Sequence, residues 1–419
     1  MKIFKNKKRK YIIITSLVST FIVIGFIITY YNSIPKEEPL IGAYIDGNYS
    51  ETLPTKGSGY AVEKIVCDNG NYANWDYDKW GINFHYYKKR GRCEIYFKSL
   101  ESFWIANKKF YVDEMLSCPT MNNDGSISID KYSQDYGYIC KGKDDYGTSY
   151  YYRGNVQNNY VYFAGFYWRI IRYNGNGTVR AIYDGTKAHL NGEEDYDRVI
   201  DNEGYNQNDK DNAYVGYMYG TPGSSTYGET HANIHDSSAK KIVDDWYYDN
   251  LRGTSYENYI SDSLFCNDRS FSKNNSGTGS GTSETYYRAY DYHIGNPLNY
   301  KMLLTCPQKN DAFTVDDSYY GNTDLTYPIG LITADEALLA GASGGRPNYS
   351  IPNYYLDIDD SFWTMTPCLY SNGAVVGDVY DNMQGYGSMG NDRGIKPVIN
   401  LKSSVLVYGN GTASDPYHA

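Results

Sequence analysis

Residues 161–183 read VYFAGFYWRIIRYNGNGTVRAIY, and this stretch decides how the rest of the chain is expected to fold. Two runs rich in β-branched and aromatic residues, 166–173 and 178–183, flank the sequence Asn-Gly-Asn-Gly at 174–177. Glycine and asparagine tolerate a positive φ, and Asn-Gly between two such runs is a strong signal for a β-hairpin. The sequence therefore predicts a hairpin that nucleates a large folded domain.

The alternation of side chains along this hairpin assigns its two faces. Arg169, Arg172 and Arg180 suit a wetter face or a strand edge. The positions expected to face the core share a spacing of two residues and are Trp168, Ile170, Val179, Ala181 and Tyr183.

The composition is that of a folded, acidic protein. Of the 419 residues, 41% are hydrophobic and 21% are charged, which is enough material for two or three domains with their own cores. The formal net charge is −10, and removing the six basic residues of segment 1–10 leaves −16 for the remainder. Such a surface repels phosphate backbones, so nucleic acid is not expected as a partner.

Tyrosine is used far above its average frequency, with 50 tyrosines in the chain. Tyrosine-rich surfaces bind well, because the rigid ring loses little entropy on contact. The alternative is that an AT-rich genome raises the tyrosine content without any binding role. Both interpretations stay open on the sequence alone.

The N-terminus predicts where the protein is placed in the cell. Six lysines and arginines within residues 1–10 precede an uncharged apolar run at 11–31. A helix of that length extends for ~30 Å, the thickness of a bilayer core. The positive charges favour a cytoplasmic segment 1–10, so we expect 11–31 to be an uncleaved signal anchor. The lipid bilayer is then a partner, and the protein is a single-pass membrane protein whose C-terminal bulk is extracellular.

Seven cysteines in an exported chain indicate disulfide bonds with one cysteine left over. Neighbours in the sequence are the favoured partners, although other connectivities stay open. The favoured pairs are Cys67–Cys93, Cys118–Cys140 and Cys266–Cys306, which leaves Cys368.

Turn-forming residues and changes in composition divide the chain that follows the anchor. Residues 32–40 are expected to be a stalk, and 41–98 a small all-β domain whose core is filled by two tryptophans and closed by the first disulfide. Residues 99–149 are expected to hold a linker helix and a disulfide loop. The main domain is expected at 150–419, with strands near its two ends paired with each other.

Two helices are expected in the main domain. Residues 237–252 begin with a capping serine, either Ser237 or Ser238, carry an apolar face and end before a glycine. Thr333 and Glu336 have the spacing of a capping box that opens a second, shorter helix.

Several motifs occur in an order that resembles a known family. They are residues 158–185, 237–252, 265–271 (FCNDRSF), 326–341 (TYPIGLITADEALLAG), 362–367 (FWTMTP) and 393–401 (RGIKPVINL). The series resembles exported domains of unknown function in surface proteins of gut Firmicutes, which are similar to the formylglycine-generating-enzyme and C-type-lectin-like folds. The resemblance implies an α+β, C-type-lectin-like domain with a twisted antiparallel sheet and two helices. Residues 66–82 and 93–97 resemble small disulfide-stapled β modules of the same class of proteins.

The resemblance also implies a position for the ligand. Relatives of that fold use the surface just before the last strands, which here is 369–394. Rings and short polar groups alternate there, which suits adaptable recognition, although a merely polar sheet edge would look the same. The candidate ligand-binding residues are Tyr370, Asn372, Asp378, Tyr380, Asp381, Asn382, Gln384, Tyr386, Asn391 and Asp392.

Patterns that suggest catalysis or metal binding have simpler explanations. His231 and His235 have the i, i+4 spacing of a helical zinc site, but they precede the expected helix, so exposure or loop packing is favoured. An oxidase like the formylglycine-generating enzymes would need a cysteine pair in the C-terminal part, where Cys368 stands alone. We assign no catalytic residue, no metal ligand and no cofactor, with structural calcium left open for the acidic turns.

These observations favour a membrane-anchored extracellular surface protein that binds a glycan or a protein through its distal domain. The alternative is a structural cell-envelope protein without a specific ligand. An exported enzyme is the least favoured class, because no convincing catalytic site is visible.

Overall fold

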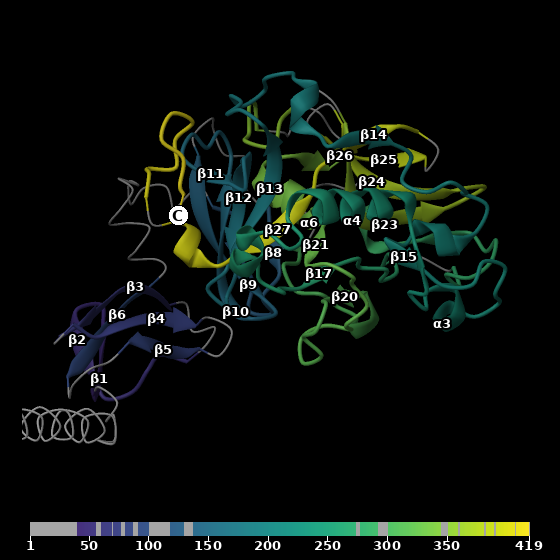
Figure 1. The fold of residues 1–419 in the computed structure, drawn as a ribbon. Coiled ribbons are helices and arrows are strands. Elements are labelled where there is room, and N and C mark those ends of the chain that lie inside the picture. Colours follow the sequence, from purple (N-terminus) through teal and green to yellow (C-terminus); the bar gives the residue numbers. More distant parts are fainter. Residues whose placement is uncertain are drawn as a thin grey trace, which may run out of the picture.

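The computed structural model describes fourteen stretches of the chain, and the others lie outside the description (Figure 1). Strands dominate the described part, with 27 strands and three α-helices. The stretches are 40–55, 60–68, 70–76, 80–86, 91–99, 118–129, 137–273, 277–291, 301–344, 351–358, 361–380, 383–388, 391–406 and 408–418.

The expected fold class, an α+β domain of C-type-lectin-like type, is wrong. The two expected helices are present, but they are short: α4 (Ser238–Asn250) has 13 residues and α6 (Ala334–Ala340) has seven. The polar stretches between the motifs add many short strands. The described fold is therefore mostly β.

Within the described stretches, no helix has the length and apolar character needed to cross a membrane. The expected cytoplasmic segment 1–10, the anchor 11–31 and the linker helix after residue 99 all lie outside these stretches.

The N-terminal module consists of a four-stranded sheet and a separate hairpin. The sheet has the order β2-β1-β6-β3, with β1 and β6 parallel, and β4 pairs with β5. Trp75 packs edge-on against Phe97 and Trp80, at 5.2 and 5.4 Å between ring centroids, so tryptophans fill the core as expected. The strands are β1 (Leu40–Ile45), β2 (Asn48–Ser50), β3 (Tyr60–Cys67), β4 (Tyr72–Asp76), β5 (Gly81–Tyr86) and β6 (Arg92–Ser99).

The predicted hairpin is confirmed and lies inside the first large sheet. β12 and β13 pair antiparallel around a turn in which Gly177 has a φ of 85°. The sheet order is β21-β27-β13-β12-β10-β9, and β11 adds to β12. The strands are β9 (Tyr138–Asp144), β10 (Gly147–Arg153), β11 (Tyr160–Phe163), β12 (Phe166–Tyr173), β13 (Val179–Gly185), β21 (Ile329–Gly330) and β27 (Val398–Leu401).

The expected pairing between the two ends of the main domain is also found. β13 pairs with β27, and Tyr160 exchanges backbone hydrogen bonds with the C-terminal segment at Gly411 and Tyr417. Segments more than 200 residues apart in sequence therefore close the first sheet together.

The second large sheet has the order β14-β26-β23-β24-β25-β22, with β18 paired to β23. Its middle strand β23 is buried along its whole length. The strands are β14 (Asp201–Glu203), β18 (Thr285–Tyr286), β22 (Ser343–Gly344), β23 (Phe362–Tyr370), β24 (Ala374–Tyr380), β25 (Met383–Ser388) and β26 (Arg393–Ile395).

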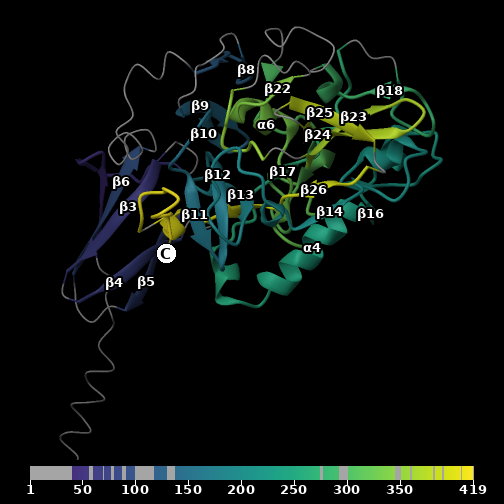
Figure 2. The ribbon, with the colours of Figure 1, turned by 90° about the horizontal axis from the view of Figure 1, so that it is seen from above.

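The two longer helices connect the sheets. α6 contacts β10 of the first sheet and β23 and β24 of the second, while α4 contacts β21 and β14 (Figures 1 and 2). Aromatic residues from both sheets, including the fully buried Trp168 and Trp363, belong to one hydrophobic core. Each helix therefore covers the region where the two sheets meet.

Short elements complete the described part. One small sheet has the order β19-β8-β7, and two-stranded pairs form between β15 and β16 and between β17 and β20. Their bounds are β7 (Thr120–Met121), β8 (Ile127–Ser128), β15 (Met218–Tyr219), β16 (His235–Asp236), β17 (Phe265–Cys266), β19 (Lys301–Met302) and β20 (Ala312–Phe313). The remaining helices are α3 (Tyr227–Thr230) and 3₁₀ turns at Tyr196–Arg198, Asn212–Val215, Ser255–Tyr259, Arg288–Tyr290, Lys309–Asp311 and Ser403–Leu406.

Candidate functional site

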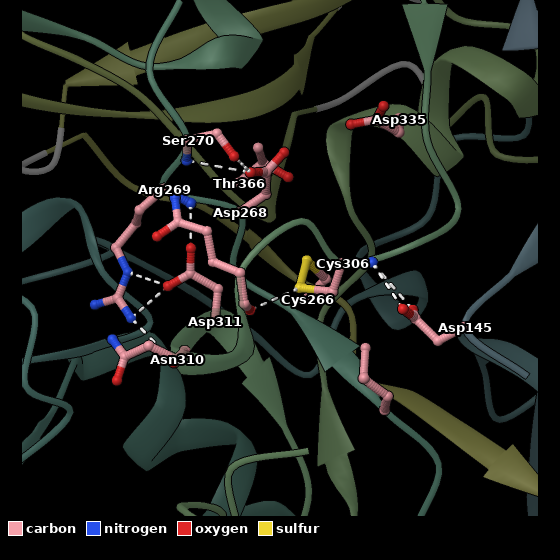
Figure 3. The surroundings of a disulfide bond; sticks show 12 residues. Asp145, Cys266, Asp268, Arg269, Ser270, Cys306, Asn310, Asp311, Asp335 and Thr366 are labelled. Carbon is pink, nitrogen blue, oxygen red and sulfur yellow. Dashed lines mark hydrogen bonds and ion pairs between the residues drawn. A yellow bond between two sulfur atoms is a disulfide. The ribbon is translucent and has the colours of Figure 1, made fainter. Parts of the chain in front are cut away.

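A polar pocket lies beside the Cys266–Cys306 disulfide, where the first sheet, α6 and the segment around β17 meet (Figure 3). Its empty volume of about 370 Å³ includes open solvent at the mouth, and the interior has room for only one or two water-sized groups. The lining residues are Arg172, Arg180, Leu264, Cys266, Asp268, Arg288, Leu303, Leu304, Thr305, Thr333, Asp335, Glu336 and Thr366.

Glu336 joins two arginines of the central hairpin. Its carboxylate lies 3.0 Å from Arg172 Nε and 2.7 Å from Arg180 Nε. The predicted capping box fixes this position, because Glu336 also accepts the Thr333 N–H at 3.0 Å while the Thr333 hydroxyl accepts the Glu336 N–H. Complete burial raises the pKa of Glu336, but the charges of Arg180 and Arg172 outweigh burial, and the net pKa lies below the ordinary value.

Arg288 forms the second charged group of the pocket. Its guanidinium donates to both oxygens of Asp335, at 3.0 and 2.8 Å, and to Asp268 Oδ2 at 2.5 Å. Two neighbouring backbone groups orient the carboxylates: Leu303 N–H donates to Asp335 at 2.7 Å, and Ser270 N–H donates to Asp268 at 3.1 Å. A bidentate pair of this kind has a fixed geometry.

Two further aspartates surround this network. Arg172 Nη1 donates to Asp144 at 2.5 Å, so this arginine bridges Asp144 and Glu336. Asp145 accepts the backbone N–H of Cys306 at 3.0 Å, which ties the disulfide to the first sheet (Figure 3). Burial raises the pKa of Asp145 to about 6, so its protonation state changes near neutral pH.

A buried ion pair supports the pocket wall from the other side. Arg269 and Asp311 are fully buried, and Arg269 Nε donates to Asp311 Oδ1 at 2.6 Å (Figure 3). Arg269 also donates to Asn233 Oδ1 at 2.8 Å, while the Arg269 backbone N–H donates to Asp311. These bonds hold the chain on both sides of the disulfide at a fixed spacing.

The charges of the pocket lining balance. Three guanidinium groups from Arg172, Arg180 and Arg288 face three carboxylates, and every one of these carboxylates is ion-paired. None of the described lining residues is a histidine or a free cysteine. Leucines, threonines and the disulfide-bonded Cys266 form the remaining wall. The arrangement is suited to holding a polar, neutral group.

The ligand surface expected at 369–394 is assembled only in part. Tyr370 and Asp378 are buried, and Asp378 accepts Arg393 Nε at 3.0 Å, so neither side chain is presented at the surface. They are buried because β23 and β24 lie inside the second sheet. Asn372, Asn391 and Asp392 are exposed. The remaining candidates have side chains outside the description and stay predictions: Tyr380, Asp381, Asn382, Gln384 and Tyr386.

The three arginines of the hairpin were expected on a wetter face or a strand edge, and that expectation is wrong. Arg169, Arg172 and Arg180 are 0%, 6% and 1% exposed, because every residue of β13 and most of β12 are covered on both faces. The sequence signal for their burial was the presence of arginines in strands whose other residues are mainly apolar. No local pattern identifies Glu336 as the partner of Arg172 and Arg180, because it lies 164 residues away from Arg172.

Other sequence patterns are explained by the fold. α3 ends at Thr230, so His231 and His235 share no helix; His231 Nε2 lies 3.3 Å from Tyr287 OH, and His235 is exposed. The turn at Asp124 joins the antiparallel strands β7 and β8, as a hairpin requires. All three disulfides have the pairing favoured by sequence neighbourhood, and Cys368 is buried and unpaired.

Known proteins do not assign this pocket. No family model, no curated protein and no solved structure matches the chain. The family resemblance suggested by the ordered motifs stays a prediction, and the function must be inferred from the geometry of the pocket.

Proposed function

We propose that the protein is an extracytoplasmic binding protein whose pocket beside Cys266–Cys306 receives the hydroxyl-rich end of a glycan. The observation that carries this proposal is the charge balance of the lining, in which three arginines are matched by three carboxylates. Hydroxyl groups donate to carboxylates and accept from guanidinium groups, so a sugar uses both halves of such a lining.

Charged ligands fit the pocket less well. A phosphate or sulfate would meet Asp268, Asp335 and Glu336, and a cation would meet the three arginines. A neutral polyol is repelled by neither set of charges. The side chains of Leu264, Leu303 and Leu304 offer an apolar wall for its C–H face. The small interior suits the hydroxyl edge of one terminal sugar, with the rest of the chain at the mouth.

The proposed location outside the cytoplasm is supported by the three disulfides, which persist in oxidising compartments. Anchoring in the cell membrane through 11–31 is part of the proposal on the strength of the sequence alone. Protease treatment of intact cells tests it: the bulk of the chain should be digested while a membrane-protected N-terminal peptide remains.

Binding is tested with the purified full chain on a glycan array, followed by titration of the best ligand. Thr305 lines the pocket, and Thr305→Phe should fill the space and abolish binding. Thr221 is exposed outside the pocket, and Thr221→Phe is the matched control that should bind like the wild type. Equal binding by the two variants would place the glycan elsewhere and refute the pocket assignment.

The alternative is a structural envelope protein without a specific ligand. Concentration-dependent self-association of the purified chain, combined with no retention on any glycan, would favour it. Binding that responds to Thr305→Phe while the protein stays monomeric would favour the glycan-binding function.

A further inference from the structure

A second polar cluster lies in the segment that connects β13 to the 3₁₀ turn Tyr196–Arg198. Its centre is His189, whose side chain is fully buried although the surrounding loop is polar. Tyr160 OH donates to the His189 carbonyl at 2.6 Å and so fixes the backbone of this residue. A buried imidazole in a loop needs partners for both of its ring nitrogens.

One ring nitrogen of His189 has such a partner. Nε2 lies 3.2 Å from Asp197 Oδ2, and Asp197 is held in turn by the backbone N–H and the hydroxyl of Thr186. The contact between His189 and Asp197 lies directly against the backbone of Gly185, which has a φ of 113°. A Cβ at this position would lie 2.6 Å from Asp197 Oδ2 and 2.8 Å from His189 Nε2, so a larger residue would push the two groups apart. Because Asp197 is an acceptor, it favours the tautomer with hydrogen on Nε2.

The other ring nitrogen then presents a lone pair. His189 Nδ1 is buried and has no hydrogen-bond partner among the described residues, and it lies 3.4 Å from Glu193 Oε1, a contact that is an ion pair only when the ring is protonated. A lone pair aimed at a carboxylate is unfavourable unless a proton or a cation lies between them.

Asp195 adds a third donor to this cluster. One donor atom from each of His189, Glu193 and Asp195 lies within 4.8 Å of the others. Asp195 is held by its own turn, where its side chain accepts the Asp197 N–H at 3.0 Å. Glu193 and Asp195 are partly exposed, so small side-chain rotations can bring their oxygens closer to Nδ1.

We propose that His189 Nδ1, Glu193 and Asp195 form a binding site for Zn²⁺. An imidazole nitrogen with two carboxylate oxygens is a zinc donor set, and water can complete a four-coordinate shell. Asp197 is then the outer carboxylate that orients the histidine, an arrangement typical of metal-bound imidazoles. The site is separate from the glycan pocket and does not depend on its function.

Lys187 supplies an internal competitor for the metal. Its ammonium group lies 2.7 Å from Asp195 Oδ2, and its side chain is 58% exposed, so it can leave when a cation binds. Breaking this ion pair lowers the affinity for zinc, because Asp195 cannot bind Lys187 and the zinc ion at full strength at the same time. Removal of the lysine charge should therefore tighten zinc binding. If the cluster is instead held together only by a proton on His189, we expect no zinc binding.

The test is a Zn²⁺ titration of the metal-stripped full chain by calorimetry at neutral pH. We expect one Zn²⁺ per chain, with Glu193→Gln and Asp195→Asn each weakening affinity by about tenfold or more. Lys187→Gln should tighten it several-fold. The matched control is Glu203→Gln, which removes the same charge from the exposed strand β14 and should bind like the wild type.

Folding is checked separately, because His189 itself is buried and its replacement could unfold the loop. The thermal midpoints of the metal-free variants should agree with that of the metal-free wild type, and zinc should raise the midpoint only where it binds. Absence of saturable zinc binding by the wild type would overturn the proposal. So would affinity that is the same in Glu193→Gln, Asp195→Asn and Glu203→Gln.

Discussion

Glu336 is a fully buried carboxylate whose charge is held by two arginines. Glu336→Gln keeps the size and one oxygen but removes the charge, so Arg172 and Arg180 lose a shared counter-ion in a buried environment. Breaking a buried ion pair by removing one partner costs about 3–5 kcal/mol. We expect a loss of that order in the free energy of unfolding, measured by urea denaturation.

The control for this substitution is Glu203→Gln, because Glu203 is exposed and no ion pair is described for its side chain. It should change the free energy of unfolding by less than about 0.5 kcal/mol. A Glu336→Gln protein as stable as this control would mean that the arginines are solvated, and the pocket would then be more open than the structure indicates.

Residue identity alone gives the wrong environment for the arginines of the hairpin. Arginine is mostly exposed in proteins, so Arg169 and Arg180 were expected on a wetter face or at a strand edge. Arg169 instead lies over the ring of Tyr160 at 3.8 Å, and Arg180 lies over Phe265 at 4.5 Å. Arg169 is covered by the neighbouring strand β11, whereas the burial of Arg180 depends on Phe265 and Glu336 from distant segments, which cannot be read from the hairpin sequence.

At the scale of one element, α4 shows how a local signal becomes a testable energy. The sequence left Ser237 and Ser238 as alternative caps, and the structure selects Ser237, whose hydroxyl accepts the Lys240 N–H at 3.1 Å. Ser237→Ala should destabilise the protein by about 1 kcal/mol, because a buried helix N–H loses its acceptor. Chemical denaturation measures this loss.

Ser238 provides the matched control in the same turn. Ser238 is the first residue of α4, and none of the described hydrogen bonds uses its side chain. Ser238→Ala should be neutral or slightly stabilising, since alanine has the better helix propensity. Equal effects from the two alanine substitutions would show that the cap hydrogen bond contributes nothing in solution.

Local signals predicted individual elements well. The hairpin of β12 and β13, the helix α4 and the capping box of α6 all lie where turn residues, caps and periodicity indicated. The fold class was not predicted correctly from the sequence. Many strands have only two residues, such as β17 and β21, and strands this short carry no alternation that a sequence pattern can detect. Such strands exist only because a distant partner strand is present.

At the scale of the whole molecule, the candidate pocket could not be predicted for the same reason. Its lining comes from β12, β13, β17, α6 and β23, which are separated by up to nearly 200 residues of chain. Sequence proximity did predict the disulfides, because each pair closes a loop of only 22 to 40 residues. Short-range links are therefore visible in the sequence, whereas the charge network that crosses the sheets is not.

The disulfides also have unequal importance for the two folded parts of the molecule. Among its described residues, the N-terminal module has a core cluster of four buried residues, Ala43, Trp75, Ile95 and Phe97, with six partly buried hydrophobic residues packed against it. A core that small seldom supports a fold by itself. Loss of a native disulfide from a small domain typically lowers the free energy of unfolding by about 2–5 kcal/mol. This loss is comparable to the whole free energy of unfolding of such a module. Cys67–Cys93 should therefore decide whether the module is folded, while the main body keeps its own large core.

We therefore predict that replacing Cys67 and Cys93 together by serine unfolds the module and leaves the main body intact. Limited proteolysis with mass analysis should show rapid cleavage within residues 40–99 and a protected fragment that contains both large sheets. The matched control replaces Cys118 and Cys140, a pair with a similar separation of 22 residues, and should leave the module protected. Protection of the module without its disulfide would show that the aromatic packing of Trp75 alone is sufficient. Digestion of the main body in the same variant would instead show that the two parts fold as one cooperative unit.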